Sequence, residues 1–337
     1  MIKIGIICPS EIALRRFLPA LNELSVFKYV GVAIANENEW EGTTKEILDN
    51  EKHKAGSFKN SYGGKIFDGY ASLIKSDEID AVYLPLPPAL HYKWARLSIE
   101  YNKHVLIEKP ATISLEQTQN LISFASQNEI AIHENYMFEF HNQIFELNEI
   151  IKSGKIGEVR LFRISFGFPQ RDANDFRYNK QLGGGAIIDC GGYTLKYASI
   201  LLGKTAKLVT AKSNFIKEFD VDIFGSATLV NDEGITAQVS FGMDNSYKCD
   251  LEVWGSFGHL HSKRVLTAPP DYIPEVQILT SNGVENIKLS SDNAFKKSLL
   301  EFYNCIQDSQ SRKYRYNAIL RQARLVDKFI KNSKYIL

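Results

Sequence analysis

The chain has 337 residues, 44% of them hydrophobic, and its 40 Lys and Arg nearly balance 39 Asp and Glu. This length corresponds to roughly two globular domains, and a net charge of +1 gives no electrostatic basis for binding nucleic acid or an anionic membrane. The four cysteines form no CxxC pair, which excludes a disulfide framework and a zinc ribbon. No apolar run approaches the roughly 18 residues of a membrane helix, and the first residues lack a signal-peptide pattern. We therefore expect a soluble, cytoplasmic protein.

Short apolar runs alternate with amphipathic stretches over the first 135 residues. Ser114 and Gln117 form a capping box at the start of the last of these helices. Strands that alternate with helices indicate βαβ units, so we predict an α/β Rossmann domain, a doubly wound parallel sheet, over residues 1–135. The expected strands are Ile2–Ile7, Tyr29–Ala35, Lys65–Phe67, Ala81–Pro85, His104–Ile107 and Ile130–His133, and the expected helices include Ile12–Leu24, Tyr92–Tyr101 and Ser114–Ser126.

From about Ala206 the pattern changes to β-branched or period-two runs separated by turn signals. Helical patterns return only at Ala294–Gln307 and Asn317–Lys331. We predict that residues 136–337 form an α+β substrate and oligomerisation domain with a large, open-faced, mostly antiparallel sheet. Helices end this domain, and the last of them can pack back on the Rossmann domain. The expected strands are Leu208–Phe215, Gly225–Val230, Thr236–Phe241, Cys249–Trp254 and Val276–Thr280, with a further strand around His259 and His261.

The turn after the first strand is where a dinucleotide pyrophosphate would bind, at a helix N-terminus. The usual G-x-G-x-x-G/A pattern is replaced by Cys8-Pro9-Ser10-Glu11-Ile12-Ala13, which keeps only the last small residue. On its own this segment is more often an ordinary strand-to-helix turn. Asn36 stands where an acidic residue at the end of the second strand would favour NAD, so its presence leans toward NADP.

Two further loops follow strands of the expected parallel sheet, at the edge where ligands bind. The first contains Leu84, Pro85, Pro87 and His91, and either a rigid cofactor-binding loop or a proline-stiffened surface loop explains it equally well. The second is Glu108-Lys109-Pro110. A partly buried lysine there is a plausible proton donor, although an exposed lysine that ends a strand is the more frequent explanation.

A glycine-rich segment, Leu182–Tyr193, leads into a helical run that ends near Gly203. If Asp189 and Tyr193 are both helical, their spacing places a carboxylate and a phenol on one face, suited to binding a sugar hydroxyl and relaying a proton. A glycine-rich helix entry with a solvated Asp and a packed Tyr is about as frequent. Just before it lies a polar stretch that is either a surface loop or a substrate contact, with Arg171, Arg177 and Tyr178. His259 and His261 have no third ligand in view, so we expect no metal site.

In combination these motifs resemble the Gfo/Idh/MocA oxidoreductases over nearly the whole chain. The resemblance rests on the Leu18–Leu21 helix, Glu108-Lys109-Pro110 and the segment from Gly183 to Tyr193. Finer features are similar to one branch, the NDP-hexose 3-ketoreductases of deoxysugar synthesis. These features are Ile12–Arg16, Leu84–Pro87, Glu134–Phe138, Arg177-Tyr178, Phe241–Met243 and Glu252–Ser256.

The resemblance implies a role for each matching position. Lys109 would contact the cofactor beside the reacting carbonyl, Tyr193 would be the proton donor, and Asp189 would bind substrate hydroxyls. Arg171, Arg177 and Tyr178 would reach the sugar nucleotide. The cofactor-binding residues would be Cys8, Pro9, Ser10, Glu11, Ile12, Asn36, Leu84, Pro85, Pro87, His91, Glu108 and Lys109. Family members usually have glycine at the positions of Cys8 and Ser10; a left-handed conformation at Ser10 would cost roughly 1–2 kcal/mol.

The expected activity is therefore reduction of a keto group, at C3, of a nucleotide-linked hexose, with NADP(H) favoured over NAD(H). Two alternatives remain open at this point: an NAD-dependent dehydrogenase of a free sugar or polyol, and a non-catalytic dinucleotide-binding or scaffold protein. The resemblance also implies a homodimer or homotetramer that forms through the open sheet face. Neither nucleic acid nor a membrane is an expected partner.

Overall fold

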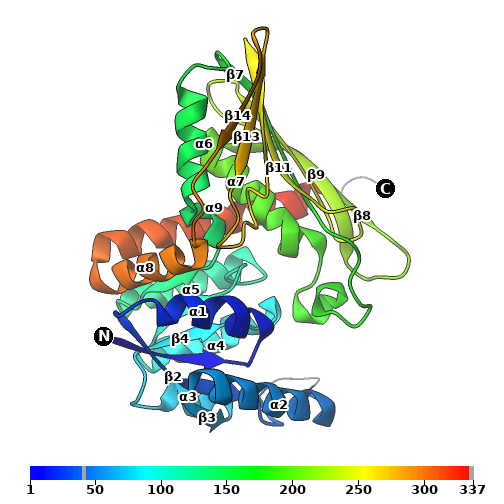
Figure 1. The fold of residues 1–337 in the computed structure, drawn as a ribbon. Helices are drawn as coiled ribbons and strands as arrows, with labels where there is room; N and C mark the ends of the chain where they lie inside the picture. Colours follow the sequence, from blue (N-terminus) through cyan, green and yellow to red (C-terminus); the bar gives the residue numbers. More distant parts are fainter. Residues whose placement is uncertain (40–42, 334–337) are drawn as a thin grey trace. The chain divides into compact units, whose positions relative to one another are not determined.

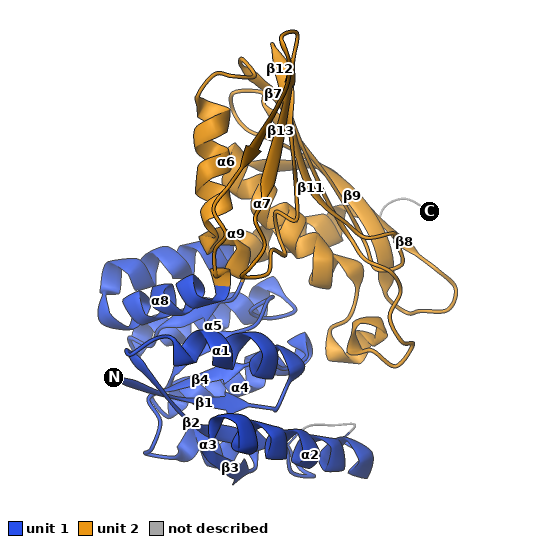
Figure 2. Cartoon of the chain, in the orientation of Figure 1, with its two compact units in different colours: residues 1–135, 295–320 blue, residues 136–294, 321–337 orange. Residues whose placement is uncertain are grey.

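The computed structural model describes residues 1–39 and 43–333 and divides the chain into two compact units (Figures 1 and 2). Unit 1 comprises Met1–Asn135 and Phe295–Leu320, and unit 2 comprises Tyr136–Ala294 and the chain from Arg321. The chain therefore passes from one unit to the other after residues 135, 294 and 320. Among the described residues, no helix is long and apolar enough to cross a membrane.

Unit 1 is built on a sheet of six parallel strands, which confirms the predicted doubly wound architecture. The spatial order β3-β2-β1-β4-β5-β6 reverses between β1 and β4, so the carboxyl ends of these two strands form the position where such sheets bind ligands. The strands are β1 (Ile2–Ile7), β2 (Phe27–Ile34), β3 (Lys65–Asp68), β4 (Ala81–Leu84), β5 (His104–Ile107) and β6 (Ile132–Glu134).

Helices pack on this sheet as the βαβ pattern requires. Ser114 accepts a hydrogen bond from the backbone N–H of Gln117 at 3.2 Å and so caps this helix as predicted, but the Gln117 side-chain oxygen makes no return bond, so the capping box is only half formed. The helices are a π-helical turn Ala13–Phe17 that continues into α1 (Leu18–Asn22), then α2 (Lys45–Tyr62), α3 (Tyr70–Lys75), α4 (Pro88–Glu100), α5 (Leu115–Gln127), α8 (Ala294–Gln307) and the first part of α9 (Ser309–Ser333).

The helix α8 joins unit 1 through aromatic packing. Phe17 stacks on Tyr83 with ring centroids 4.2 Å apart, and Phe295 on α8 packs edge-on against these two rings at 6.2 and 6.3 Å. The sequence analysis had assigned residues 295–320 to the second domain because they follow its sheet along the chain. Burial of the apolar face of α8 against Phe17 and Tyr83 accounts for the difference.

Unit 2 is built on an eight-stranded sheet in the order β14-β13-β12-β11-β7-β10-β9-β8. The strands β7 and β10 run parallel and every other neighbouring pair is antiparallel, as expected for a mostly antiparallel sheet. The strands are β7 (Val159–Gly167), β8 (Lys207–Phe215), β9 (Asp222–Val230), β10 (Thr236–Gly242), β11 (Lys248–Gly255), β12 (Gly258–Lys263), β13 (Glu275–Thr280) and β14 (Gly283–Lys288).

The two faces of this sheet differ in character. The covered face carries buried apolar side chains such as Ile164 and Phe241, and Phe241 packs against Phe329 of α9 at 5.5 Å. The helices α6 (Asn142–Lys152) and α7 (Gly192–Leu202) lie on one side of the sheet in Figure 2. On the other face Arg163 pairs with Glu252 at 3.2 Å, and Trp254 is 53% exposed. The sheet is therefore open on one face, as predicted.

Candidate functional site

The turn after β1 carries its backbone strain at Cys8. This residue has φ of 77°, in the left-handed region that non-glycine residues avoid. Ser10 does not share that conformation; its side chain accepts a hydrogen bond from the N–H of Ala13 at 3.2 Å and so caps the following helix. The condition under which Ser10 would be strained is therefore not met, and the residue in place of the first glycine, Cys8, is the one in the left-handed region.

A buried carboxylate that the sequence analysis missed holds this turn in place. Glu51, on α2, accepts hydrogen bonds from the Ala35 N–H at 2.7 Å, the Tyr70 hydroxyl at 2.6 Å and the Cys8 thiol at 3.4 Å. It thereby connects the ends of β1 and β2. Burial, and then the charge of Glu51, raise the pKa of the Cys8 thiol well above its usual value, so the thiol stays protonated and unreactive.

The strain at Cys8 predicts an unusual order of stability for two variants. Because glycine adopts positive φ without penalty, Cys8→Gly should be more stable than Cys8→Ala by roughly 1 kcal/mol, although both lose the thiol hydrogen bond. At an ordinary negative φ the alanine variant would be the more stable of the two. Urea unfolding of the two purified variants measures the difference, and an alanine variant of equal or greater stability would contradict the strain.

Asn36 lies exposed just after the end of β2. The carboxylate of Glu39, three residues later, is hydrogen-bonded to backbone N–H groups. Glu39 accepts hydrogen bonds from the backbone N–H of Asn36 at 3.1 Å, of Tyr70 at 2.7 Å and of Ala71 at 2.7 Å. Its carboxylate thus caps the N-terminus of α3, where a negative charge is favourable. Asn36, Glu37 and Asn38 are all exposed in this segment, so the position that follows β2 carries an amide with the exposed carboxylate of Glu37 beside it.

The loop after β4 is tied to the loop after β5 by His91. Its two ring nitrogens lie 2.8 Å from the carbonyl oxygens of Leu86 and Pro110, and the side chain is fully buried. Burial lowers the pKa of His91 to about 4, so the ring is neutral at physiological pH and donates to only one of these two carbonyl oxygens. Leu84 and Pro85 are also buried, whereas Pro87 is partly exposed where it precedes α4. His91 thus holds two loops of the ligand-binding edge together.

Glu108 points into the interior next to Lys109. Its carboxylate accepts hydrogen bonds from the Tyr83 hydroxyl at 2.6 Å and the Asn135 side chain at 2.7 Å. Asn135 in turn accepts from Ser298 of α8 at 2.8 Å. Burial raises the pKa of Glu108. This network fixes the end of β5, from which the partly exposed Lys109 projects.

In unit 2, the predicted substrate residues form a connected group. Arg177 donates to Asp189 at 2.8 Å and pairs with Asp175 at 3.1 Å. Tyr178 donates to the carbonyl oxygen of Met243 at 3.1 Å and accepts from the backbone N–H of Arg171 at 3.0 Å. The structure thus brings these four predicted residues together, with Tyr178 in a supporting position and Asp189 held by a cation.

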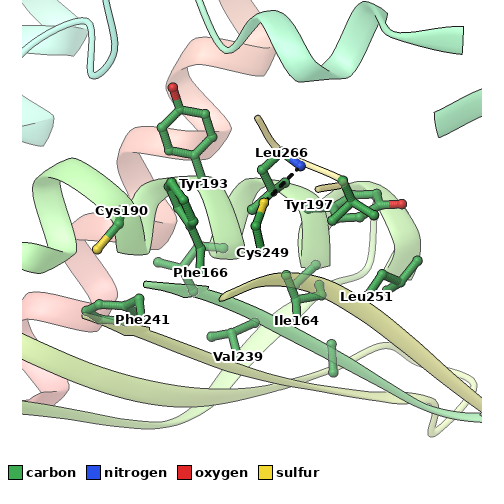
Figure 3. Close-up of a cluster of buried hydrophobic side chains, with 14 of the residues drawn as sticks. Ile164, Phe166, Cys190, Tyr193, Tyr197, Val239, Phe241, Cys249, Leu251 and Leu266 are labelled. Carbon is green, nitrogen blue, oxygen red and sulfur yellow. Dashed lines mark hydrogen bonds between the residues drawn. The ribbon is translucent and has the colours of Figure 1, made fainter. Parts of the chain in front are cut away.

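Tyr193 sits in an aromatic cage with its hydroxyl at the edge of the cluster. Its ring lies 5.1 Å from that of Tyr136, 5.4 Å from that of Phe166 and 5.8 Å from that of Phe138. Figure 3 shows the Tyr193 hydroxyl pointing away from the sheet. The cage orients the phenol, and the residue as a whole is 9% exposed.

Two partners near Tyr193 were not predicted from the sequence. Lys196, one helical turn later, forms a largely buried ion pair with Glu139 at 3.0 Å and stands over the Tyr136 ring at 5.3 Å. Gln322 of α9 donates to the carbonyl oxygen of Gly192 at 2.8 Å. Both contacts join residues that are distant in sequence, so no local pattern signals them.

Asp222 fixes the entry of the helix that carries Asp189 and Tyr193. It accepts a hydrogen bond from the Ile187 N–H at 2.8 Å, and a Cβ at Gly185, where φ is +121°, would lie only 2.5 Å from the Asp222 carboxylate. Burial raises the pKa of Asp222 to about 6, against 3.8 for an unburied group. Glycine is therefore required at position 185 for both the conformation and the close approach.

This pKa predicts a pH dependence of stability. Because the folded protein binds the Asp222 proton more tightly than the unfolded chain, the contribution of Asp222 to the free energy of unfolding should rise as pH falls from about 6 toward 4, by roughly 1 kcal/mol per pH unit. Asp222→Asn removes this contribution and leaves the other titrating groups unchanged. Denaturant unfolding of both proteins at several pH values isolates it; a stability difference that is constant between pH 7 and 4 would contradict the assignment.

Comparison with known proteins agrees with this architecture. Residues 15–136 match the oxidoreductase family with an NAD-binding Rossmann fold, and residues 144–261 match the GFO/IDH/MocA C-terminal domain. Over 97% of its length the chain is 34% identical to a dTDP-3,4-didehydro-2,6-dideoxy-alpha-D-glucose 3-reductase of Actinomadura kijaniata, and it covers 94% of that protein. The chain belongs to the Gfo/Idh/MocA oxidoreductase family.

Other family members are similar over the same extent. A reductase of the same name from Streptomyces violaceoruber is 32% identical, with 97% of this chain and 94% of the relative covered. Among solved structures, a 3-ketoreductase from Actinomadura kijaniata in complex with NADP and TDP-benzene superposes with a TM-score of 0.90 at 33% identity, over 98% of this chain and 97% of the other. The similarity is thus end to end.

Proposed function

We propose that this Gfo/Idh/MocA family member reduces the C3 keto group of a nucleotide-linked hexose with NADPH. The observation that carries the proposal is the cage that holds Tyr193 with its hydroxyl directed away from the sheet, four residues after an Asp189 that Arg177 orients. A scaffold protein has no need of a phenol and a carboxylate held in this way. The extended similarity to dTDP-sugar 3-reductases supports the same substrate class.

The described residues of unit 1 fit a dinucleotide. The sheet order supplies the binding edge, the helix whose N-terminus Ser10 caps begins there, and Asn36 stands in place of the carboxylate that would favour NAD. When bound, NADPH supplies the hydride that reduces the carbonyl carbon. The residues we assign to the cofactor are Cys8, Pro9, Ser10, Glu11, Ile12, Asn36, Pro87 and Lys109, with Leu84, Pro85, His91 and Glu108 supporting them from within.

Tyr193 donates its phenolic proton to the carbonyl oxygen as negative charge develops there, so that the product is a secondary alcohol. Lys109 stabilises that charge electrostatically and orients the reactants. Asp189, Arg177 and Arg171 bind the substrate, and Tyr178 holds Arg171 through its backbone. These roles rest on the family's motif and on the contacts of each side chain in its own unit.

We also propose that the protein forms a homo-oligomer and acts in the cytoplasm. The open face of the unit 2 sheet, with Trp254 at 53% exposure, is the surface through which we expect a homodimer or homotetramer to form. All four cysteines are free thiols, in keeping with a reducing cytoplasm.

A thermal shift assay followed by turnover tests the proposal. NADPH at about 100 times its dissociation constant should stabilise the protein by about 2.7 kcal/mol, a shift of a few degrees, and NADH should shift it less. Reduction of a dTDP-linked 3-keto sugar, with no turnover of the free sugar, should follow. A shift with NADH alone and turnover of a free sugar would support the dehydrogenase alternative. No shift with either cofactor would leave only the scaffold.

A further inference from the structure

A second cluster of aromatic and cationic side chains lies near the start of β11, in segments to which the proposed mechanism gives no role. The guanidinium of Arg264 stands over two tyrosine rings, 5.2 Å from the centroid of Tyr247 and 5.8 Å from that of Tyr272. Arg264 and Tyr247 are exposed, and Tyr272 is half-buried. The cluster therefore places an exposed guanidinium over the faces of two tyrosine rings, one exposed and one half-buried.

The backbone that carries Arg264 is held in an uncommon conformation. Its φ is 52°, in the left-handed region that non-glycine residues rarely adopt and that is concentrated at ligand sites. The side-chain nitrogen of the buried Gln143 lies 3.4 Å from the carbonyl oxygens of Arg264 and Val265. The Tyr247 hydroxyl and the Thr267 hydroxyl share a hydrogen bond at 2.8 Å. The cluster is thus built into the fold of unit 2.

Tyr193, on α7, packs near the end of the unit 2 sheet at which β7 ends and β11 begins. Cys249 pairs with Phe166 across β11 and β7, and the Phe166 ring packs against Tyr193 at 5.4 Å. The Cys249 sulfur also accepts hydrogen bonds from the Leu266 N–H and the Thr267 hydroxyl, both at 3.4 Å. Figure 3 shows Cys249 and Leu266 beside the part of α7 that bears Tyr193. One buried cysteine thus links the Arg264 loop to the proposed proton donor.

We propose that Tyr247, Arg264 and Tyr272 bind the nucleoside diphosphate of the substrate. This inference rests on the proposed function. A pyrimidine base stacks on a tyrosine ring whatever its substituents, and the planar guanidinium of Arg264 pairs with the diphosphate oxygens. Two carboxylates, Glu275 and Asp250, lie near Tyr272. Asp250 contacts His261 at 3.2 Å and Lys248 at 4.0 Å, and the lysine charge offsets part of its repulsion of a phosphate.

Calorimetric titration with deoxythymidine diphosphate, without any sugar or turnover, tests this site. Arg264→Gln should weaken binding about tenfold or more, because a charge-assisted contact is lost, and Tyr272→Leu should weaken it several-fold through lost stacking. The matched control is Arg163→Gln, since Arg163 stands over Trp254 at 5.9 Å on the open face of the same sheet. That variant should bind as the unaltered protein does.

The outcomes separate this site from the proposed function. If the unaltered protein binds the diphosphate and Arg264→Gln binds it equally well, the site is wrong and the function stands. If the unaltered protein binds no nucleoside diphosphate, both are wrong. A second titration tests whether the cluster binds the cofactor instead of the substrate. Adenosine 2′,5′-bisphosphate, a fragment of NADP, should bind Arg264→Gln as tightly as it binds the unaltered protein. If its affinity fell together with that for deoxythymidine diphosphate, the cluster would belong to the cofactor site.

Discussion

Tyr193→Phe is expected to lower kcat for the keto-sugar nucleotide by about 10²–10⁴, the range typical of a lost general acid. The ring keeps its packing against Tyr136, Phe138 and Phe166, so the melting temperature should change little. The affinity for NADPH should be unchanged, because the substitution leaves unit 1 intact. Steady-state kinetics together with a melting curve of the same preparation separate lost chemistry from lost folding.

The matched control is Tyr197→Phe on the next turn of α7. Tyr197 is fully buried among the same hydrophobic residues, and its hydroxyl makes no hydrogen bond among the described residues. This variant should keep nearly full activity. If Tyr193→Phe retained turnover within a few-fold of the unaltered enzyme, the proton would have to come from another group and the assignment would be abandoned.

Lys109→Ala is expected to reduce kcat/KM by about 10²–10³, because it removes a cation from the position where negative charge develops on the carbonyl oxygen. The carboxylate of Glu108 keeps its hydrogen bonds from Tyr83 and Asn135, so the end of β5 should stay ordered. Unlike the tyrosine variant, this one should also bind NADPH more weakly, since the same lysine is assigned to the cofactor. Single-turnover kinetics at saturating NADPH isolate the chemical step.

Lys103→Ala provides a control at the opposite end of the same strand. Lys103 precedes β5 and donates to the carbonyl oxygen of Ile79 at 2.8 Å, far along the strand from Lys109. It should lose some stability and no catalytic rate. If Lys109→Ala had an unaltered single-turnover rate, we would conclude that Lys109 binds the cofactor or substrate and does not take part in the chemical step.

Local sequence patterns predicted much of the fold. The bounds expected for β1, β5 and α8 agree with the structure, because each of these elements is delimited by its own apolar periodicity. The N-cap at Ser114 also needed only neighbouring residues. By contrast, β7 was not predicted, although Leu161–Phe166 alternates, since its place in the middle of the sheet depends on pairing with β10 and β11 far along the chain.

For the site, too, short motifs were enough to find some residues, whereas others act on partners far along the chain. Motif spacing indicated Asp189, Tyr193 and Lys109, whose roles follow from short segments. Glu51 and Asp222 could not be found in this way, because each acts on a backbone N–H group 16 or 35 residues distant. The position of strain in the first turn also required coordinates: the sequence shows that two glycines are missing, but only the φ angle of Cys8 shows which one mattered.

The discontinuous make-up of unit 1 constrains how the chain can be recombined. The sheet of residues 1–135 is covered on one face by Phe295 and Phe302 of α8, which pack on Phe17, Tyr83 and Phe27. A fragment that ends at Asn135 would leave these rings bare to water and prone to aggregation. A graft that exchanges the Rossmann domain between relatives, to change cofactor specificity, must therefore include residues 295–320 as well. Transfer of this one domain thus requires two separate segments of the gene.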